Sequence, residues 1–217
     1  MKMADIDKLH STSEADGLPL YAMSRWNPLK HIFIKRLKLL NSMFPEGKVY
    51  DKLLEVGYGS GVLIPEFLQR CNIYYGIDIH NQQKIVDEVV RKGDPRIRIG
   101  YGDLCECPYP DDMFDCVVSL SVLEHIKDID KAVREIARVL KKDGVLIAGF
   151  PIENGISNLI LDIVKLFIGF DRKVHHLSNH KQILSALSKH LINERDLFYP
   201  FANIPSASLF YCGVWRK

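Results

Sequence analysis

Three glycines at alternate positions stand between a predicted strand and a predicted helix. Gly57, Gly59 and Gly61 follow the acidic residue Glu55 in the sequence Glu-Val-Gly-Tyr-Gly-Ser-Gly. A glycine-rich turn at this place lets a ligand approach the backbone, because glycine has no Cβ in the way. The dinucleotide-binding pattern GxGxxG would require a third glycine where this chain has Val62, which argues against a nicotinamide or flavin dinucleotide. The Gly-Lys-Ser/Thr ending of a phosphate-binding P-loop is also missing.

An acidic residue stands at the end of the next predicted strand. Asp78 closes the sequence Tyr-Tyr-Gly-Ile-Asp, 21 residues after Gly57. A carboxylate at this place can accept hydrogen bonds from both hydroxyls of a ribose, which fits an adenosyl ligand. The glycine loop alone would be a weak signal. The order strand, loop, helix, strand and terminal aspartate is a much stronger one, and it indicates a nucleoside-binding site.

Histidines are the candidate acid–base residues of this chain. His125 follows a predicted strand, and His175, His176 and His180 lie within six positions of one another in a later connector. We expect His125 to line the pocket rather than to act as a base, and we hypothesise that one of the connector histidines approaches the reacting group. The candidate catalytic residues are therefore His125, His176 and His180. Because no carboxylate or cysteine completes an obvious ligand set around the connector histidines, we predict no metal site.

The elements that must position these residues follow a repeating pattern. Near-continuous apolar runs predict strands at 49–56, 72–79, 96–102, 113–120 and 145–150. Between them, helical spacing of apolar residues predicts helices at 61–70, 81–92 and 128–142. Apolar strands that alternate with amphipathic helices are typical of a parallel sheet covered on both faces.

Composition excludes several classes of protein. The chain has 217 residues, of which 47% are hydrophobic and 26% are charged, as in a soluble protein with a sizeable core. Its net charge of +2 is too small to imply nucleic acid as a partner. Five cysteines without a CxxC spacing, and a polar N-terminal segment without an apolar signal core, predict reduced thiols in the cytoplasm. No run of eighteen apolar residues predicts a membrane-spanning helix.

The region from about residue 50 to 151 resembles the class I S-adenosylmethionine-dependent methyltransferases. Within that family it is most similar to the enzymes that methylate small metabolites, quinones and lipids. The similarity rests on separate motifs in the expected order, namely LLEVGYGSGVLIPEF, YYGIDIH, YGDLCECPYPDD, MFDCVVSLSVLEHI and LKKDGVLIAGFP. The resemblance implies S-adenosyl-L-methionine as the cofactor and a small molecule as the methyl acceptor.

The resemblance also assigns residues to the cofactor. The implied contacts are Glu55, Gly57, Tyr58, Gly59, Gly61, Asp78, Ile79, Gly102, Asp103, Leu104, Ser119 and Leu120. Glu55 and the glycine loop would hold the methionine end, Asp78 the ribose, and Asp103 the exocyclic amine of the adenine. Asp103 has the simpler alternative of capping a turn. Tyr58 stands where small or polar residues are common, so its ring either shapes the methionine pocket or points to solvent.

Segments on both sides of this core complete the expected fold. We predict further helices at 28–40, 156–170 and 181–191, and two C-terminal strands that form a hairpin at the sheet edge. The expected fold is α/β, a Rossmann-like three-layer sandwich with a mostly parallel seven-stranded sheet and a C-terminal antiparallel hairpin. We expect a single domain with four parts: an N-terminal arm and helical extension (1–49), a cofactor-binding core (50–151), a cap (152–193) and closing strands (194–217). Glu135 and Arg138, three residues apart on a predicted helix, are expected to form a surface ion pair.

The methyl acceptor is not specified by these motifs. Displacement at a sulfonium needs alignment of donor and acceptor, and needs a base only when the acceptor is a poor nucleophile. The apolar helices at 28–40 and 156–170 are most simply interpreted as buried parts of a cap. A second interpretation is a hydrophobic tunnel or membrane-facing surface for a lipid or prenylated acceptor, with peripheral membrane contact.

Two other functions fit parts of the pattern. A non-catalytic module would keep the fold and the adenosyl pocket for regulation or assembly. A nucleic-acid methyltransferase is disfavoured, because Ser119-Leu120-Ser121-Val122 stands where amino-methylating enzymes carry a DPPY- or NPPY-type tetrapeptide. We therefore expect no nucleic-acid partner, and the sequence does not address the oligomeric state.

Overall fold

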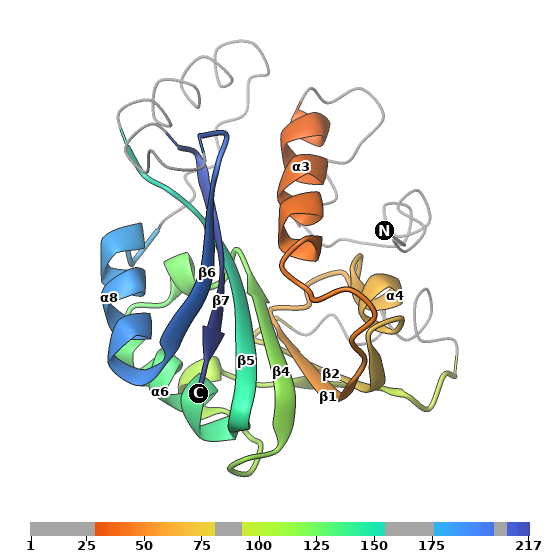
Figure 1. The fold of residues 1–217 in the computed structure, drawn as a ribbon. Coiled ribbons are helices and arrows are strands. Elements are labelled where there is room, and N and C mark those ends of the chain that lie inside the picture. Colours follow the sequence, from red (N-terminus) through yellow and green to blue (C-terminus); the bar gives the residue numbers. More distant parts are fainter. Residues whose placement is uncertain (1–28, 81–92, 155–175, 202–207) are drawn as a thin grey trace.

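The computed structural model describes residues 29–80, 93–154, 176–201 and 208–217 (Figure 1). The predicted N-terminal arm, the helices predicted at 81–92 and 156–170, and His175 lie outside these ranges. Among the described residues, no helix is long and apolar enough to cross a bilayer.

A seven-stranded sheet forms the centre of the molecule. Its strands are β1 (Tyr50–Val56), β2 (Cys71–Asp78), β3 (Ile97–Tyr101), β4 (Phe114–Leu120), β5 (Leu140–Pro151), β6 (Ile192–Tyr199) and β7 (Phe210–Arg216). They lie in the order β3-β2-β1-β4-β5-β7-β6, with β1 to β5 parallel and β7 antiparallel to both β5 and β6. This order confirms the predicted fold class, including the C-terminal antiparallel hairpin at the sheet edge. From β1 the chain continues to β2 and β3 on one side of the sheet, and then returns to β4 and β5 on the other side of β1. Ligands of open α/β sheets bind at the carboxyl ends of the two strands where the strand order reverses in this way, here β1 and β4.

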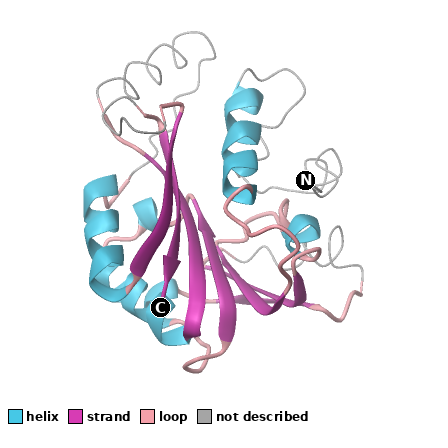
Figure 2. Cartoon of the chain, in the orientation of Figure 1, coloured by secondary structure: helices cyan, strands magenta, loops and turns pink. Residues whose placement is uncertain are grey.

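Helices cover both faces of the sheet. The helices are α3 (Leu29–Asn41), α4 (Ile64–Phe67), α6 (Ile129–Val139) and α8 (His180–His190), with 3-10 turns η2 (Leu104–Glu106) and η3 (Leu123–His125). Figures 1 and 2 show α6 and α8 on one face and α3 and α4 on the other. Alternate residues of β1 explain the two cores: Leu54 packs with the α6 and α8 side, and Leu53 packs with the α3 and α4 side.

Two predicted helices are shorter than their apolar spacing suggested. The helix predicted at 61–70 is confined to α4. Gly61 has a φ of +73°, and the amides of Gln69 and Arg70 donate to carbonyl oxygens three residues earlier rather than four. The helix predicted at 128–142 ends at Val139, because the buried Leu140 already pairs with Phe114 as the first residue of β5. Strand β5 therefore begins five residues before the strand predicted at 145–150, and Asp143, with a φ of +62°, is an irregularity within it.

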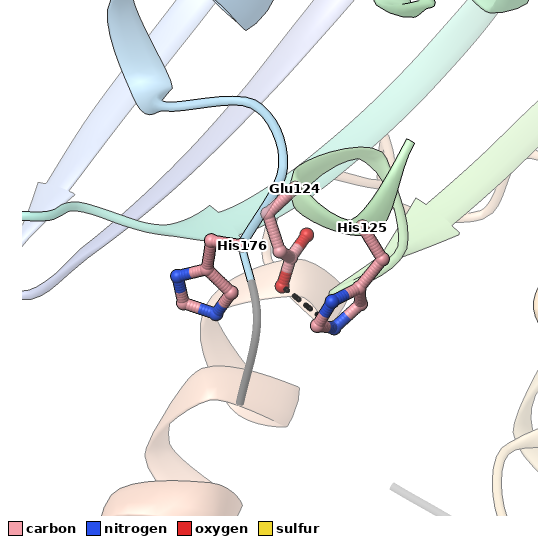
Figure 3. Close-up of side chains that lie close together, drawn as sticks. All are labelled: Glu124, His125 and His176. Carbon is pink, nitrogen blue, oxygen red and sulfur yellow. Dashed lines mark ion pairs between the residues drawn. The ribbon is translucent and has the colours of Figure 1, made fainter. Parts of the chain in front are cut away.

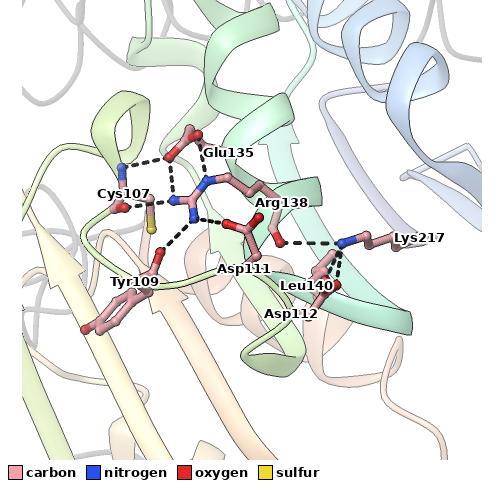
Figure 4. A network of polar contacts seen from close by, with 8 residues as sticks. All are labelled: Cys107, Tyr109, Asp111, Asp112, Glu135, Arg138, Leu140 and Lys217. Carbon is pink, nitrogen blue, oxygen red and sulfur yellow. Dashed lines mark hydrogen bonds and ion pairs between the residues drawn. The ribbon is translucent and has the colours of Figure 1, made fainter.

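The ion pair on α6 is more than a surface contact. Besides Glu135, the guanidinium of Arg138 donates to the carbonyl oxygens of Cys107 and Tyr109 at 2.9 and 2.8 Å and to Asp111 at 2.7 Å (Figure 4). Glu135 in turn accepts from the backbone amide of Cys107 at 3.1 Å. These partners raise the pKa of Arg138, led by its hydrogen bond to Glu135. The predicted ion pair is therefore present, and its further partners tie the loop after β3 to α6.

Candidate functional site

The glycine loop leaves β1 at its carboxyl end with three residues in the left-handed region. The φ angles of Gly57, Gly59 and Gly61 are +74°, +50° and +73°, which other residues adopt only with strain. A Cβ on Gly57 would lie 2.2 Å from Cγ2 of Val122, so this glycine is also required for packing. A Cβ on Gly59 would meet no described atom within 4 Å. The backbone of Gly59 therefore faces open space, as a cofactor-binding loop requires.

The carboxylate of Asp78 joins this loop to the end of β2. Its Oδ2 accepts from the amide of Gly59 at 2.8 Å, and its Oδ1 accepts from the amide of His80 at 2.8 Å. Each carboxylate oxygen can accept a second hydrogen bond, so both keep capacity for ligand hydroxyls. The next residue, Ile79, is 58% exposed, unlike most large apolar side chains of the sheet. An exposed apolar side chain beside a ribose-binding carboxylate is consistent with the predicted contact to an adenine face.

Glu55 lies deeper in the sheet than the predicted contact with a methionine end suggested. It is only 5% exposed, and its Oε2 accepts from the hydroxyl of Tyr74 at 2.5 Å. Burial raises the pKa of Glu55 to about 8; the hydrogen bond from Tyr74 lowers it, and the nearby charge of Asp78 raises it further. No pattern in the sequence indicated this role for Tyr74. The hydroxyl of Tyr74 reaches Glu55 because β1 and β2 are neighbouring strands in this register. The contact of Glu55 with a ligand stays a prediction.

Tyr58 points into the protein. It is 3% exposed and belongs to the core on the α3 and α4 side. Its ring lies over Gly76 of β2, where an added Cβ would come within 2.9 Å of Cδ1 of Tyr58. Of the two predicted positions, the one in solvent is therefore wrong. The missing side chain at Gly76 makes room for the ring under the glycine loop.

The loop after β3 reaches the same end of the sheet. The amide of Gly102 donates to the carbonyl oxygen of Asp78 at 3.0 Å, which places this loop beside the end of β2. Asp103 is exposed, and its Oδ1 caps the η2 turn by accepting from the amide of Cys105 at 2.8 Å. Leu104 is buried in the core. The structure thus supplies the turn-capping role for Asp103, and its contact with an adenine stays a prediction.

Ser119 lies at the carboxyl end of β4, beside the start of the glycine loop. It pairs in register with Val56 of β1, and Leu120 follows it, opposite Gly149 of β5. Ser119 is fully buried, and its hydroxyl has no hydrogen-bond partner among the described residues. An unsatisfied buried hydroxyl is costly, and its presence at this sheet edge fits a group that is completed by a ligand.

Two histidines that are far apart in the sequence meet beyond the end of β4. The rings of His125 and His176 have centroids 5.4 Å apart, and the carboxylate of Glu124 lies between them (Figure 3). Nδ1 of His176 is 2.5 Å from Oε1 of Glu153, at the end of β5. Glu124 is 3% exposed, and burial raises its pKa to about 7. The sequence suggested neither carboxylate, because each is distant along the chain from the connector histidines.

The backbone fixes this arrangement. The carbonyl oxygen of Glu124 accepts from the amides of Leu177 and Ser178 at 2.8 and 3.1 Å. The hydroxyl of Ser178 donates to the carbonyl oxygen of Ile126 at 2.7 Å. His180, the third candidate, is the first residue of α8, and the group formed by Glu124, His125 and His176 does not include it. The structure therefore brings two of the three candidate histidines together.

Arg36 of α3 joins the same end of the sheet. Its guanidinium donates to the hydroxyl of Ser121 and stacks over the ring of Phe210 at 4.3 Å. Desolvation lowers the pKa of Arg36, while the charge of Glu124 acts in the opposite direction. This arginine fixes α3 over the carboxyl end of β4 and the amino end of β7.

The central part of the chain is similar to known methyltransferases. Residues 54–148 match the family model described as "Methyltransferase domain". The chain is 33% identical over 104 residues to the uncharacterized methyltransferase YcgJ of Bacillus subtilis. The aligned region covers 46% of this chain and 40% of that protein. It is 34% identical over 103 residues to the 27-O-demethylrifamycin SV methyltransferase of Amycolatopsis mediterranei, with 46% and 38% covered. The chain therefore aligns with less than half the length of these relatives.

Solved structures share the fold over most of the chain. The N-methyltransferase NodS from Bradyrhizobium japonicum, in complex with S-adenosyl-l-homocysteine, superposes with a TM-score of 0.70 at 14% identity and covers 98% of this chain and 97% of that chain. The geranyl diphosphate methyltransferase superposes with a TM-score of 0.65 at 14% identity, covering 93% and 83%. At such identities the likeness establishes the fold alone.

Proposed function

We propose that the chain carries a class I S-adenosylmethionine-dependent methyltransferase domain and that it transfers a methyl group from S-adenosyl-L-methionine to a small-molecule acceptor. The observation that carries the proposal is the contact between the glycine loop and Asp78. It holds the open backbone of Gly59 beside a carboxylate that can still accept hydrogen bonds. When bound, the cofactor supplies the reactive methyl group, and the protein binds, orients and excludes water.

The described residues fit this cofactor at three points. Gly59 leaves space for the ligand, Asp78 would hold the ribose hydroxyls, and the buried hydroxyl of Ser119 would gain the partner that it lacks among the described residues. Ile79 would cover one face of the adenine with its exposed side chain. These groups come from β1, β2 and β4, whose carboxyl ends meet where the strand order reverses.

The acceptor side of the proposal lies beyond the end of β4. His125 and His176 would approach the acceptor there, whereas His180 stands apart at the start of α8. The finer proposal is an apolar, lipid- or quinone-like acceptor, supported by the apolar sequence of residues 156–170. Under this proposal the labelled product partitions into an organic phase, and the protein co-sediments with liposomes at low salt. Absence of liposome binding would remove the membrane contact and leave methyl transfer intact.

Isothermal titration calorimetry with S-adenosylmethionine and S-adenosylhomocysteine tests the cofactor. We expect both to bind, and we expect Asp78→Asn to weaken binding at least about tenfold, since it removes a charge-assisted acceptor. Asp51→Asn is the control, because Asp51 is an exposed aspartate near the opposite end of β1. Failure of the wild-type protein to bind either compound contradicts the proposal.

Transfer of a labelled methyl group into fractionated metabolite extracts tests turnover. The proposal expects label in one or a few small-molecule fractions. Binding of the cofactor without transfer into any fraction overturns the catalytic proposal and supports the alternative, a non-catalytic module of the same fold.

A further inference from the structure

Three potential metal ligands converge at the carboxyl end of β4. Glu124 and His125 come from η3, and His176 comes from the segment that leads into α8. Each offers one ligand atom, and these atoms lie within 4.8 Å of one another. We propose that Glu124, His125 and His176 bind a divalent transition-metal ion. The connector histidines showed no completing carboxylate in the sequence, and the fold supplies it from η3.

The spacing of these groups is that of ligands rather than of hydrogen-bonded partners. Oε1 of Glu124 lies 4.0 Å from Nε2 of His125, beyond hydrogen-bonding distance. Oε2 of Glu124 is buried and has no hydrogen-bond partner among the residues described. Ligand atoms on a tetrahedral ion with bonds of about 2.1 Å are separated by about 3.4 Å, so small side-chain rotations close the site. A cation would satisfy a buried carboxylate oxygen that is otherwise costly.

Glu153 supplies the outer partner that a metal-binding histidine requires. Its Oε1 lies 2.5 Å from Nδ1 of His176, and a carboxylate can only accept there, so Nδ1 carries the proton. This fixes the tautomer of His176 and leaves Nε2 with a free lone pair. Histidine ligands almost always donate their other ring nitrogen in this way to a carboxylate, carbonyl or water.

The site is built and open on one side. Backbone hydrogen bonds from Leu177 and Ser178 to the carbonyl of Glu124 hold the two ligand-bearing segments together without an ion. The side chains of Glu124, His176 and His125 are 4%, 16% and 44% exposed, so accessibility increases towards His125. An ion held by three protein ligands keeps at least one position for water or an oxygen of another molecule. That this molecule is the methyl acceptor rests on the proposed function, but the metal site itself does not.

The donor set selects the class of ion. Two imidazoles and one carboxylate suit Zn²⁺, Fe²⁺, Co²⁺ or Mn²⁺ rather than Ca²⁺ or Mg²⁺, which prefer oxygen ligands. Arg36 lies near Glu124 and offsets part of its charge. Glu153 contributes a second carboxylate, so the surroundings as a whole still favour a divalent cation.

Titration of the chelator-treated full chain with Zn²⁺ tests the site by calorimetry, and Co²⁺ tests it by visible absorption. We expect one ion per chain and ligand-field bands that report nitrogen and oxygen ligands. His176→Gln and Glu124→Gln should each weaken binding at least about 100-fold, and Glu153→Gln about 10- to 100-fold. The matched controls are His190→Gln on α8 and Glu194→Gln, which pairs with Arg216; neither should change the metal affinity.

Two outcomes overturn the metal site: no stoichiometric binding by the wild-type chain, or equal affinity in wild type and His176→Gln. The first would mean that Arg36 alone compensates Glu124, and the second that the ion binds elsewhere on the chain. S-adenosylmethionine affinity, measured on each variant, shows whether the protein is folded. The same measurement separates the two proposals. If the wild-type protein does not bind S-adenosylmethionine, the proposed methyl transfer is contradicted, but the measured metal affinity still supports the metal site.

Discussion

The amide of Gly59 donates a 2.8 Å hydrogen bond to the carboxylate of Asp78, and this contact joins two strands at the place where ligands bind in this type of sheet. The loop and the aspartate are 19 residues apart in the sequence and belong to neighbouring strands. Their contact means that the shape of the loop and the position of the acidic group depend on each other. A change in either should therefore alter cofactor affinity through the other.

Replacement of Gly59 by alanine should separate strain from ligand contact. Gly59 and Gly47 both have positive φ, +50° and +70°, and a Cβ on either meets no described atom within 4 Å. Both Gly→Ala variants should therefore lose about 1 kcal/mol of unfolding free energy, measured in urea. Gly59→Ala alone should weaken binding of S-adenosylmethionine about tenfold or more, because its Cβ enters the space facing the ligand. Equal affinities in the two variants would show that the cofactor does not use this face.

The local parts of this site could be predicted from the sequence. Glycine spacing and a terminal aspartate are determined by neighbours in the chain, so the loop, Asp78 and the alternating strands follow from pattern alone. The register of the sheet is not local. It places Tyr74 against Glu55 and Gly76 beneath Tyr58, and no spacing along the chain announces either contact.

The histidine cluster shows the same limit more clearly. His125 and His176 were both candidate residues, but their neighbours were missing from the prediction. Glu153 lies 23 residues before His176, and Glu124 lies next to His125, so neither falls within the connector that contains His176. Only the return of the chain from β5 to α8 brings the two carboxylates to these rings.

The ionisation of Glu55 should make folding stability depend on pH. Burial raises its pKa from 4.5 to about 8, so between these values the folded protein holds a proton that the unfolded chain releases. The stabilisation is complete below about pH 4.5 and is lost as the pH rises through about 8. Glu55→Gln should remove this component and flatten the decline by roughly 2–5 kcal/mol between pH 5 and 9.

Thermal melts across this pH range, followed by circular dichroism, measure the effect. Glu46→Gln is the control at an exposed glutamate and should retain the wild-type profile. A Glu55→Gln profile that is parallel to wild type would show that Glu55 is ionised in the folded protein.

Removal of the Arg138 guanidinium should destabilise the fold more than removal of its neighbour on the same helix. Arg138 donates to two backbone carbonyls and two carboxylates, whereas Arg134 pairs only with Asp130 among the contacts described for it. We expect Arg138→Ala to cost about 2–3 kcal/mol and Arg134→Ala less than about 1 kcal/mol in urea unfolding. Costs of equal size would mean that the loop after β3 does not depend on this network.

The hydroxyl of Ser119 offers a test that separates binding from stability. It is fully buried and has no hydrogen-bond partner among the described residues, so Ser119→Ala should leave the unliganded protein as stable as wild type or slightly more stable. If the hydroxyl of Ser119 forms a hydrogen bond with the cofactor, the same change should weaken S-adenosylmethionine binding about two- to tenfold.

Ser208 is the control, since it is equally buried but donates a hydrogen bond to the carbonyl oxygen of Phe201 at 2.9 Å. Ser208→Ala should therefore lower stability by about 1 kcal/mol and leave the affinity unchanged. Calorimetry measures the cofactor affinity of the two variants, and urea unfolding measures their stability. A Ser119→Ala protein with lower stability and wild-type affinity would show that this hydroxyl stabilises the fold and does not contact the cofactor.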